Sequence, residues 1–134
     1  MADANYRAIP GAIAAADLSA SKYMAVRFSG TGRQVTTIGT ATSERPIGIL
    51  QDDPDVALEP ADVAYDGVCK AELGGTVTVG NTLAVEDGGE LIADVEVADG
   101  SAVDLHHIAT ALESGVDGDI IDVLLHTPIR IGLE

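Results

Sequence analysis

The sequence predicts a small all-β protein, either a barrel or a sandwich, and three observations carry this prediction. Segment 74–90, GGTVTVGNTLAVEDGGE, places short runs of β-branched and aliphatic residues between glycine turns. The chain is 46% hydrophobic but only 3% aromatic, so small aliphatic side chains must fill the core, which favours thin β layers. Its 15 glycines provide positions where the backbone can reverse at little steric cost.

Length and charge limit the possible functions. A chain of 134 residues forms one ordinary domain with a core of its own. The net charge of −15 argues against nucleic acid or an anionic membrane as a partner, because a phosphate surface needs clustered cations and the chain has only 7 Lys and Arg residues. No run approaches the roughly 20 apolar residues that span a bilayer. Residues 1–5 also lack the basic start of a signal peptide.

The beginning of the chain predicts an arm. Residues 1–12 show no periodicity and contain Pro10-Gly11, so we expect an N-terminal arm outside a single β domain that spans residues 13–134. The Ala-rich segment 12–18 allows one helical turn at most, because an isolated helix of that length is unstable. We therefore expect few helices or none.

The rest of the first half predicts strands separated by turns. Pro46 has a fixed φ and offers no donor, so we expect it at the entry of a strand. Segment 51–60 is an acidic loop, and it lacks the spacing of oxygen ligands that an EF-hand uses for calcium. The expected strands are 22–28 and 34–38, which form a hairpin, then 47–50, and one or two strands within 62–73.

The second half contains one ambiguous segment. Leu105, Ile108 and Leu112 have helical spacing, but comparison with the first half favours a strand over 108–112. We predict the strand. The other expected strands of this half are 76–79, 83–85, 91–97, 120–125 and, after Pro128, 129–133.

The two halves, about 18–73 and 74–128, repeat each other at an interval of roughly 60 residues. Each unit consists of a hairpin, a strand, an acidic turn and another strand. Neither unit can bury its apolar face alone, so the repeat predicts a pseudo-symmetric β-barrel with one shared core. The matching segments are 23–26 with 82–85, 47–49 with 108–110, and 62–64 with 119–121.

Three segments, taken in their order and spacing, carry a resemblance to a known family. They are ERPIGI at 44–49, VTVGNTL at 77–83 and DGDIIDVLL at 117–125. Together they resemble the small phage capsid cement, or head-decoration, proteins over about residues 15–128. Ser21 stands where that family usually has its first turn glycine, and Ala109 replaces the second copy of the glycine at 48.

The resemblance implies a β-barrel or β-tulip protein that trimerises on the outside of a virus head. It would grip the major capsid protein after head expansion through its arm or its acidic loops, and the net charge predicts a basic or calcium-neutralised footprint on the capsid. The expected capsid contacts are Ala4, Asn5, Tyr6, Arg7, Ile9 and Pro10. The expected trimer contacts, on two apolar strands, are Ile47, Ile49, Ile121, Val123 and Leu125.

The sequence offers little material for catalysis, and we expect no enzyme activity, cofactor or resident metal. His106 and His107 are adjacent, so on a strand they point to opposite faces, and we expect incidental surface or interface histidines. One histidine from each subunit on a threefold axis would be the alternative. Cys69 is alone, so it forms no intramolecular disulfide, and we expect a small buried hydrophobe.

Two other functions compete with capsid decoration. A small trimeric enzyme would need carboxylates with raised pKa values in a cleft between subunits. A glycosidase in particular also needs aromatic side chains to stack on sugars, and the chain has few. A carbohydrate-binding or cell-surface β-module is the third function considered.

Overall fold

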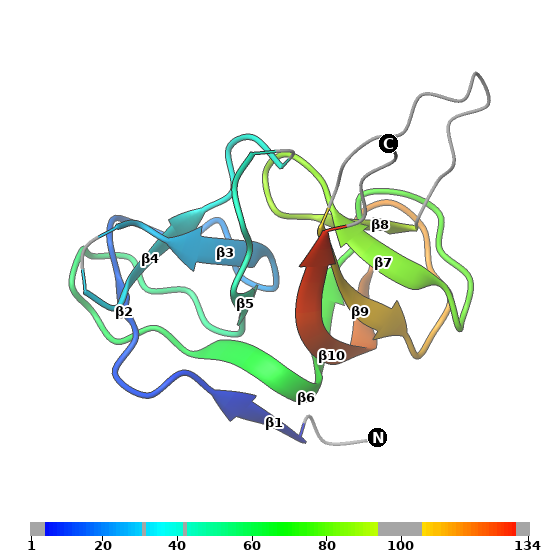
Figure 1. The fold of residues 1–134 in the computed structure, drawn as a ribbon, viewed down its shortest axis with the longest axis horizontal. Helices are drawn as coiled ribbons and strands as arrows, with labels where there is room; N and C mark the ends of the chain where they lie inside the picture. Colours follow the sequence, from blue (N-terminus) through cyan, green and yellow to red (C-terminus); the bar gives the residue numbers. More distant parts are fainter. Residues whose placement is uncertain (1–4, 31, 42, 94–105, 131–134) are drawn as a thin grey trace.

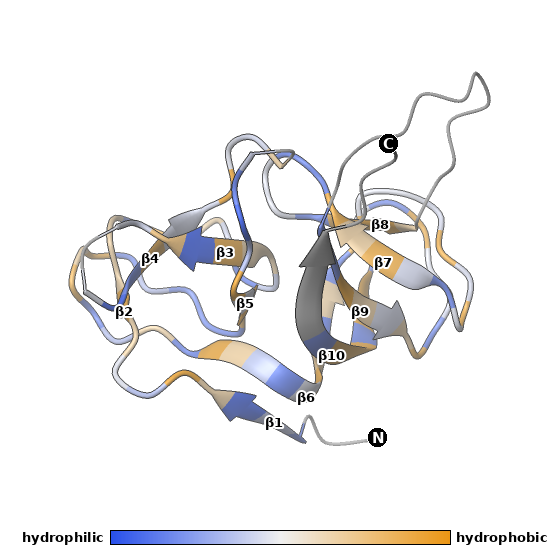
Figure 2. Ribbon diagram, viewed as in Figure 1, coloured by the Kyte–Doolittle hydropathy of each residue, from blue (hydrophilic) through white to orange (hydrophobic). Residues whose placement is uncertain are grey.

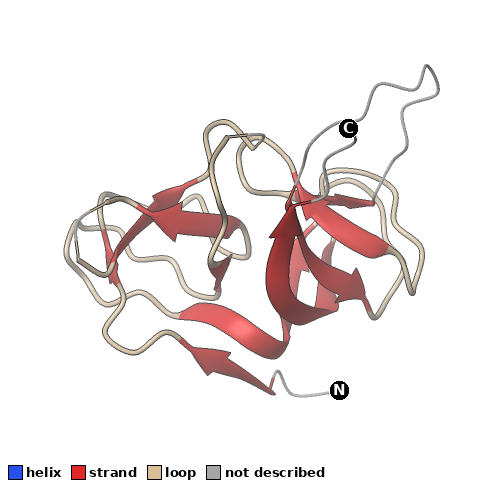
Figure 3. Cartoon of the chain, in the orientation of Figure 1, coloured by secondary structure: helices blue, strands red, loops and turns tan. Residues whose placement is uncertain are grey.

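The computed structural model describes residues 5–30, 32–41, 43–93 and 106–130. The regular structure of this part is entirely β, without a helix, which confirms the all-β class (Figures 1 and 3). The strands are β1 (Asn5–Ala8), β2 (Ile13–Ala14), β3 (Ala25–Phe28), β4 (Gln34–Thr37), β5 (Gly48–Leu50), β6 (Val63–Glu72), β7 (Thr82–Val85), β8 (Leu91–Ala93), β9 (His106–Ala111) and β10 (Ile120–Arg130).

The strands form one 10-stranded sheet whose order is β2-β4-β3-β5-β6-β10-β9-β7-β8, with β1 added to β6. Figure 1 shows two lobes, with β2 to β5 in one and β7 to β10 in the other, joined by β6. The path is open, because β2 and β8 at its ends do not pair with each other. The predicted barrel is therefore not confirmed.

The strand order is the same in the two lobes when each is followed outward from the centre. β6 is followed by β5, β3 and β4 on one side, and β10 is followed by β9, β7 and β8 on the other. Each lobe thus contains a hairpin whose first strand pairs with a later strand of the same half. Descent of the two halves from one repeated unit stays a prediction.

β6 holds the lobes together because three strands pair with it. Ala64 faces both Ile49 of β5 and Ala8 of β1, so these two strands lie on opposite edges of β6. Gly67 likewise faces both Tyr6 of β1 and Leu125 of β10. β5 and β10 therefore follow one another along one edge, and β1 occupies the other.

Most strand predictions are confirmed, and the exceptions have local causes. The hairpin of β3 and β4 is present, and the ambiguous segment is a strand, β9. The expected strand at 76–79 is wrong: only Val77 forms a bridge, to Gly115, because this segment crosses the end of the β9–β10 pair without running alongside a strand. The segment after Pro128 continues β10 to Arg130 and is no separate strand there.

The helical turn allowed in the Ala-rich segment is also absent. Ile13 and Ala14 form β2 instead. Ala12 and Ala14 are buried, and their backbones form hydrogen bonds with Leu58 and Glu59 of the acidic loop and with Ala61, just before β6. Parts of two predicted strands, residues 94–97 and 131–133, lie outside the described residues.

Aliphatic side chains fill two core clusters. The larger one lies around β6 to β10 and extends to Ala25 and Ile49, and the smaller one packs β2, β3 and β4 against Leu50 and Val63. Figure 2 shows hydrophobic residues along β7 and β9, and hydrophilic residues in the loop between β5 and β6. Cys69 belongs to the larger cluster, and burial raises its pKa to about 12. Among the described residues it is a small buried hydrophobe, as predicted.

Candidate interaction surface

The expected capsid contacts lie at the start of the chain, and the structure ties most of them to its own sheet. Asn5 and Arg7 are exposed on β1, whereas Tyr6 is half-buried and donates a hydrogen bond from its hydroxyl to Asp62. Burial first, and then this carboxylate, raise the pKa of Tyr6. Ala4 lies outside the described residues. The contact of these residues with a capsid stays a prediction.

The expected trimer contacts occupy two different environments. Ile49, Ile121, Val123 and Leu125 are all buried in the core of the protomer itself, so they are not available to a sister copy. Strand alternation explains this, because the other face of β10 carries the exposed Ile120 and Leu124 instead. Ile47 is the exception, because it is half-buried and lines a hollow at the surface.

An apolar hollow opens on the lobe of β2 to β5. It has a volume of about 360 Å³. Its two aromatic side chains are both exposed, Phe28 at 42% and Tyr65 at 38%. Single exposed hydrophobic residues are common, but a cluster of them marks an interaction surface. The lining residues are Ile9, Pro10, Phe28, Arg45, Pro46, Ile47 and Tyr65.

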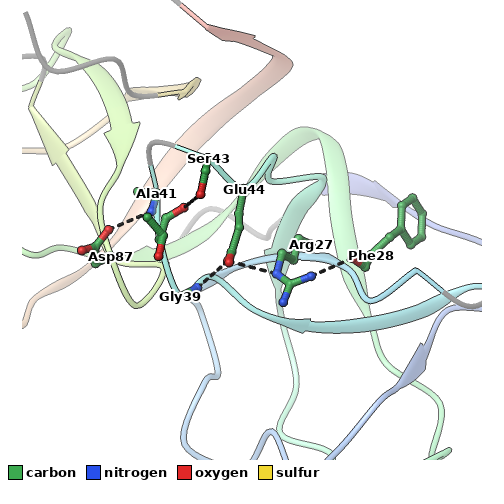
Figure 4. A network of polar contacts seen from close by, with 8 residues as sticks. Arg27, Phe28, Gly39, Ala41, Ser43, Glu44 and Asp87 are labelled. Carbon is green, nitrogen blue, oxygen red and sulfur yellow. Dashed lines mark hydrogen bonds and ion pairs between the residues drawn. The ribbon is translucent and has the colours of Figure 1, made fainter.

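Figure 4 shows a carboxylate, Glu44, that holds the loop leading to Arg45 and Pro46, two lining residues of the hollow. Glu44 accepts a hydrogen bond from the backbone N–H of Gly39 at 2.7 Å, and its Oε1 lies 3.0 Å from Nε of Arg27. The N–H of Gly39, more than the guanidinium of Arg27, lowers the pKa of Glu44. These contacts close the loop before Arg45 and Pro46, so both residues are held at the hollow's rim.

The same loop contacts the other lobe. The backbone N–H of Ala41 donates to Oδ1 of Asp87 at 2.8 Å (Figure 4), and Gly88 N–H donates to the carbonyl of Ile38 at 2.9 Å. The β7–β8 turn therefore supports the segment that leads to the hollow.

The hollow is the basic part of an acidic protein. Within residues 5–30, 32–41, 43–93 and 106–130, the ion pairs are Arg27 with Glu44 and Lys70 with Asp122, so Arg45 at the rim has no carboxylate partner there. Arg33 donates to the carbonyl of Pro10, another rim residue, at 2.9 Å. An apolar surface with an unneutralised guanidinium can bind a partner that combines apolar and acidic groups.

A second exposed apolar surface lies in the other lobe, at the turn between β9 and β10. Val116 is 54% exposed and Ile120 is 47% exposed. Their neighbours Glu113, Asp117 and Asp119 are exposed carboxylates. This surface is therefore apolar and acidic, in contrast to the hollow.

The histidines do not lie where the sequence suggested. His106 and His107 are both buried in the protomer, with 6% and 5% exposure, so the expectation of surface or interface histidines is wrong for this pair. Strand β9 is covered on both faces, which places adjacent side chains inside. In the part of the chain that the structure describes, no three His, Cys, Asp or Glu side chains are arranged to hold a metal ion. The described residues also contain no helix that could span a membrane.

Sequence reasoning missed the hollow, because its lining comes from four distant parts of the chain. The Arg-Pro-Ile run at 45–47 gave one signal, which indicated a strand entry, and Ile9, Pro10 and Ile47 were expected as separate contacts with a capsid or a sister copy. Phe28 and Tyr65 gave a weaker one, because they are two of the few aromatic residues. Their exposure depends on strand pairing, which the local pattern does not determine.

Comparison with known proteins identifies a similar fold. No protein-family model matches the chain, and no curated protein matches it. Among solved structures, the chain is similar to the head fiber gp8.5 N base in bacteriophage phi29, with a TM-score of 0.62 over 88% of this chain and 93% of that chain. The sequence identity is 15%, so the similarity is one of fold. The protein therefore shares its all-β architecture with the base of a phage head fiber.

Proposed function

We propose that the chain is a structural protein of a phage head. It binds the outer surface of the expanded shell as a homotrimer and stabilises the lattice of the major capsid protein. We also propose that its two similar halves together form a small β-barrel or β-tulip. The observation that carries it is the fold similarity to a phage head fiber base across most of both chains.

A second line of support is independent of that comparison. The order and spacing of the segments at 44–49, 77–83 and 117–125 resemble head-decoration proteins, which are a different group of phage head proteins. Both lines support a structural role on a virus head. Neither involves catalysis, and we propose a role without a reaction.

Binding would stabilise the shell by mass action. A protein that binds only the expanded lattice lowers the free energy of that lattice by its own binding free energy. Repetition over many equivalent sites adds these contributions, and a trimer that holds several sites at once gains avidity.

Cosedimentation with heads of the virus that encodes the chain tests the proposal. We expect saturable binding to expanded heads and none to unexpanded ones. Exposed Arg7 on β1 is the best probe of the expected capsid contact, since Arg7→Glu should weaken binding roughly tenfold through charge reversal. Lys22→Glu makes the same charge change at another exposed cation and should leave binding unchanged.

Substitution is a sharper test than deletion of the arm. Removing residues 1–12 would also strip β1 from β6 and remove the buried Ala12, so lost binding would not report on contact alone. Equal binding of Arg7→Glu and the unmodified chain would exclude Arg7 from the contact. No binding of the unmodified chain to either kind of head would contradict the proposed function.

A further inference from the structure

We propose that the β9–β10 turn of one copy, residues 112–120, docks into the apolar hollow of a second copy. The inference rests on the proposed function only for the number of copies, and it names the contact that joins them. Arg45 of one copy would pair with Asp117 of the next, and Val116 would enter the hollow beside Phe28.

The two surfaces are complementary in charge and in polarity. Of the 7 Lys and Arg residues, five lie within residues 5–47, whereas only two of the 22 Asp and Glu residues, Asp17 and Glu44, lie there. Glu44 is already paired with Arg27, and no carboxylate of the described residues forms an ion pair with Arg45 at the rim. The five cations are Arg7, Lys22, Arg27, Arg33 and Arg45.

The turn presents the opposite charge together with matching apolar groups. Val116 and Leu112 are exposed, the latter at 41%, and three exposed carboxylates, Glu113, Asp117 and Asp119, are close to them in the chain. The acidic loop at 51–60 has exposed hydrophobic residues too, but it bonds to Ala14 and Leu18 on the same lobe as the hollow, whereas the turn lies on the other lobe, so each copy presents the turn and the hollow apart. The β9–β10 turn is therefore the better partner for the hollow.

The turn is held in one conformation, which lowers the entropic cost of docking. Asp119 Oδ2 accepts a hydrogen bond from Val116 N–H at 2.9 Å, and Asp119 N–H donates to the carbonyl of Val116 at 3.0 Å. Gly115 exchanges backbone hydrogen bonds with Val77, and Gly118 N–H donates to the carbonyl of Leu73 at 2.8 Å. Gly118 has positive φ and open space around its Cα, so the tip of the turn is accessible.

The turn belongs to the lobe of β7 to β10 (Figure 1), whereas the hollow is lined from β3, β6 and the segments before β2 and β5, and it is open, so a copy does not fill its own site. The contact is therefore heterologous: each copy offers its turn to one neighbour and its hollow to another. Repetition of such a contact closes into a ring when the rotation allows it, and a trimer is one such ring. Ile9 and Pro10, expected to touch the capsid, would then face a sister copy.

Charge swaps in the full-length chain test the contact by sedimentation equilibrium. We expect the unmodified chain to self-associate at an ionic strength that screens the mutual repulsion of copies with a net charge of −15. Arg45→Glu and Asp117→Arg should each weaken association at least tenfold, and the double variant Arg45→Glu/Asp117→Arg should restore it. Asp117→Arg is the more telling single change, because it reduces the net negative charge and yet should reduce association.

Matched variants separate the contact from general effects of charge and exposure. Lys22→Glu repeats the charge change of Arg45→Glu at another site. Val116→Asp places a charge at the apolar centre of the contact, and Val56→Asp is its control because Val56 is similarly exposed, at 58%. Both controls should associate like the unmodified chain. Circular dichroism confirms that each variant is folded.

Cysteine cross-linking tests the geometry directly. The buried Cys69, with its pKa raised to about 12, stays protonated and does not compete. The variant Phe28→Cys/Val116→Cys should form covalent multimers on mild oxidation, and Phe28→Cys alone should not. Absence of multimers in the double variant would overturn the inference.

Two further results would overturn it. One is an unmodified chain that stays monomeric at every concentration, and the other is association that Arg45→Glu and Val116→Asp leave unchanged. Head binding is measured separately, so a chain that binds expanded heads as a monomer refutes this contact alone. Self-association without head binding refutes the proposed function alone.

Discussion

Gly48 shows how one hydrogen atom sets the spacing of two strands. A methyl group on Gly48 would overlap the backbone carbonyl oxygen of Ala64 and lie 3.0 Å from Cγ1 of Val63. Its φ does not require glycine, so the need comes from the close approach of β5 to β6. Ala109, the matching residue of the second half, is buried with its methyl group in place. The close approach is therefore a feature of the first half alone.

Gly48→Ala should destabilise the protein by about 1–3 kcal/mol, because the backbone of β6 must move to make room. Gly75→Ala is the matched control, since its methyl group would meet only Cγ2 of Ile92, at 3.9 Å. Urea denaturation of the two variants measures the difference. Equal midpoints would show that β5 and β6 tolerate a wider spacing.

At the scale of elements, the pairing of β1 with β6 depends on Gly67. This glycine has a φ of 96°, and a methyl group there would overlap the carbonyl oxygen of Asn5 and lie 3.0 Å from Cα of Tyr6. The register also shifts at Arg7 and Ala8, so β1 bends around this point. β1 is thus an edge strand held by one permissive backbone position.

Gly67→Ala should release β1. The control is Gly80→Ala, because Gly80 has a similar φ of 91° with no atom within 4 Å of the added methyl group. Backbone strain alone should cost the control about 1 kcal/mol. Gly67→Ala should cost more and should speed amide hydrogen exchange in residues 5–8. Unchanged exchange there would mean that β1 stays docked.

The strand pattern was largely predictable from sequence because turn chemistry and β-branched runs are local signals. The hairpin of β3 and β4 was found in this way, whereas the strand at 108–112 was found by comparison with the first half, against its helical spacing. Pairing was not: β6 was expected as one or two strands, and its role between the lobes depends on which edges β5, β10 and β1 occupy. The interaction surface was missed for the same reason, because Tyr65 and Phe28 meet only once the sheet has formed.

At the scale of the whole molecule, some of the carboxylates that give the net charge of −15 are crowded together between strands and turns. Glu72 of β6 and Glu86 of the β7–β8 turn are partly buried, and both lie near Glu90 and Asp117. Desolvation first, and then these neighbours, raise the pKa of Glu72 and of Glu86. Their neutral forms are therefore favoured in the folded state.

The sign of the pH dependence follows from these two raised pKa values. Stability from Glu72 and Glu86 is fully present below the unfolded-state pKa of 4.5 and is lost as pH rises through the folded-state values. We expect a higher Tm at pH 5.5 than at pH 7.5. Glu44, with its lowered pKa, acts in the opposite direction, but only below pH 4.5.

Glu86→Gln should raise Tm at pH 7.5 and flatten its pH dependence. Asp53→Asn removes one charge at an exposed site and should change neither by a comparable amount. Thermal unfolding followed by circular dichroism at several pH values provides the measurement. A Tm that falls steadily from pH 7.5 to 5.5 would contradict the expectation.

The shared strand β6 also constrains how such a gene can change. Its first residues complete the sheet of one lobe and its last residues complete the sheet of the other, so no boundary within it yields two separable modules. Recombination that exchanged one half of the chain would leave part of β6 next to a strand with which it did not evolve, in place of β5 or β10. We therefore expect the two halves to be inherited as a single piece while their sequences diverge around it.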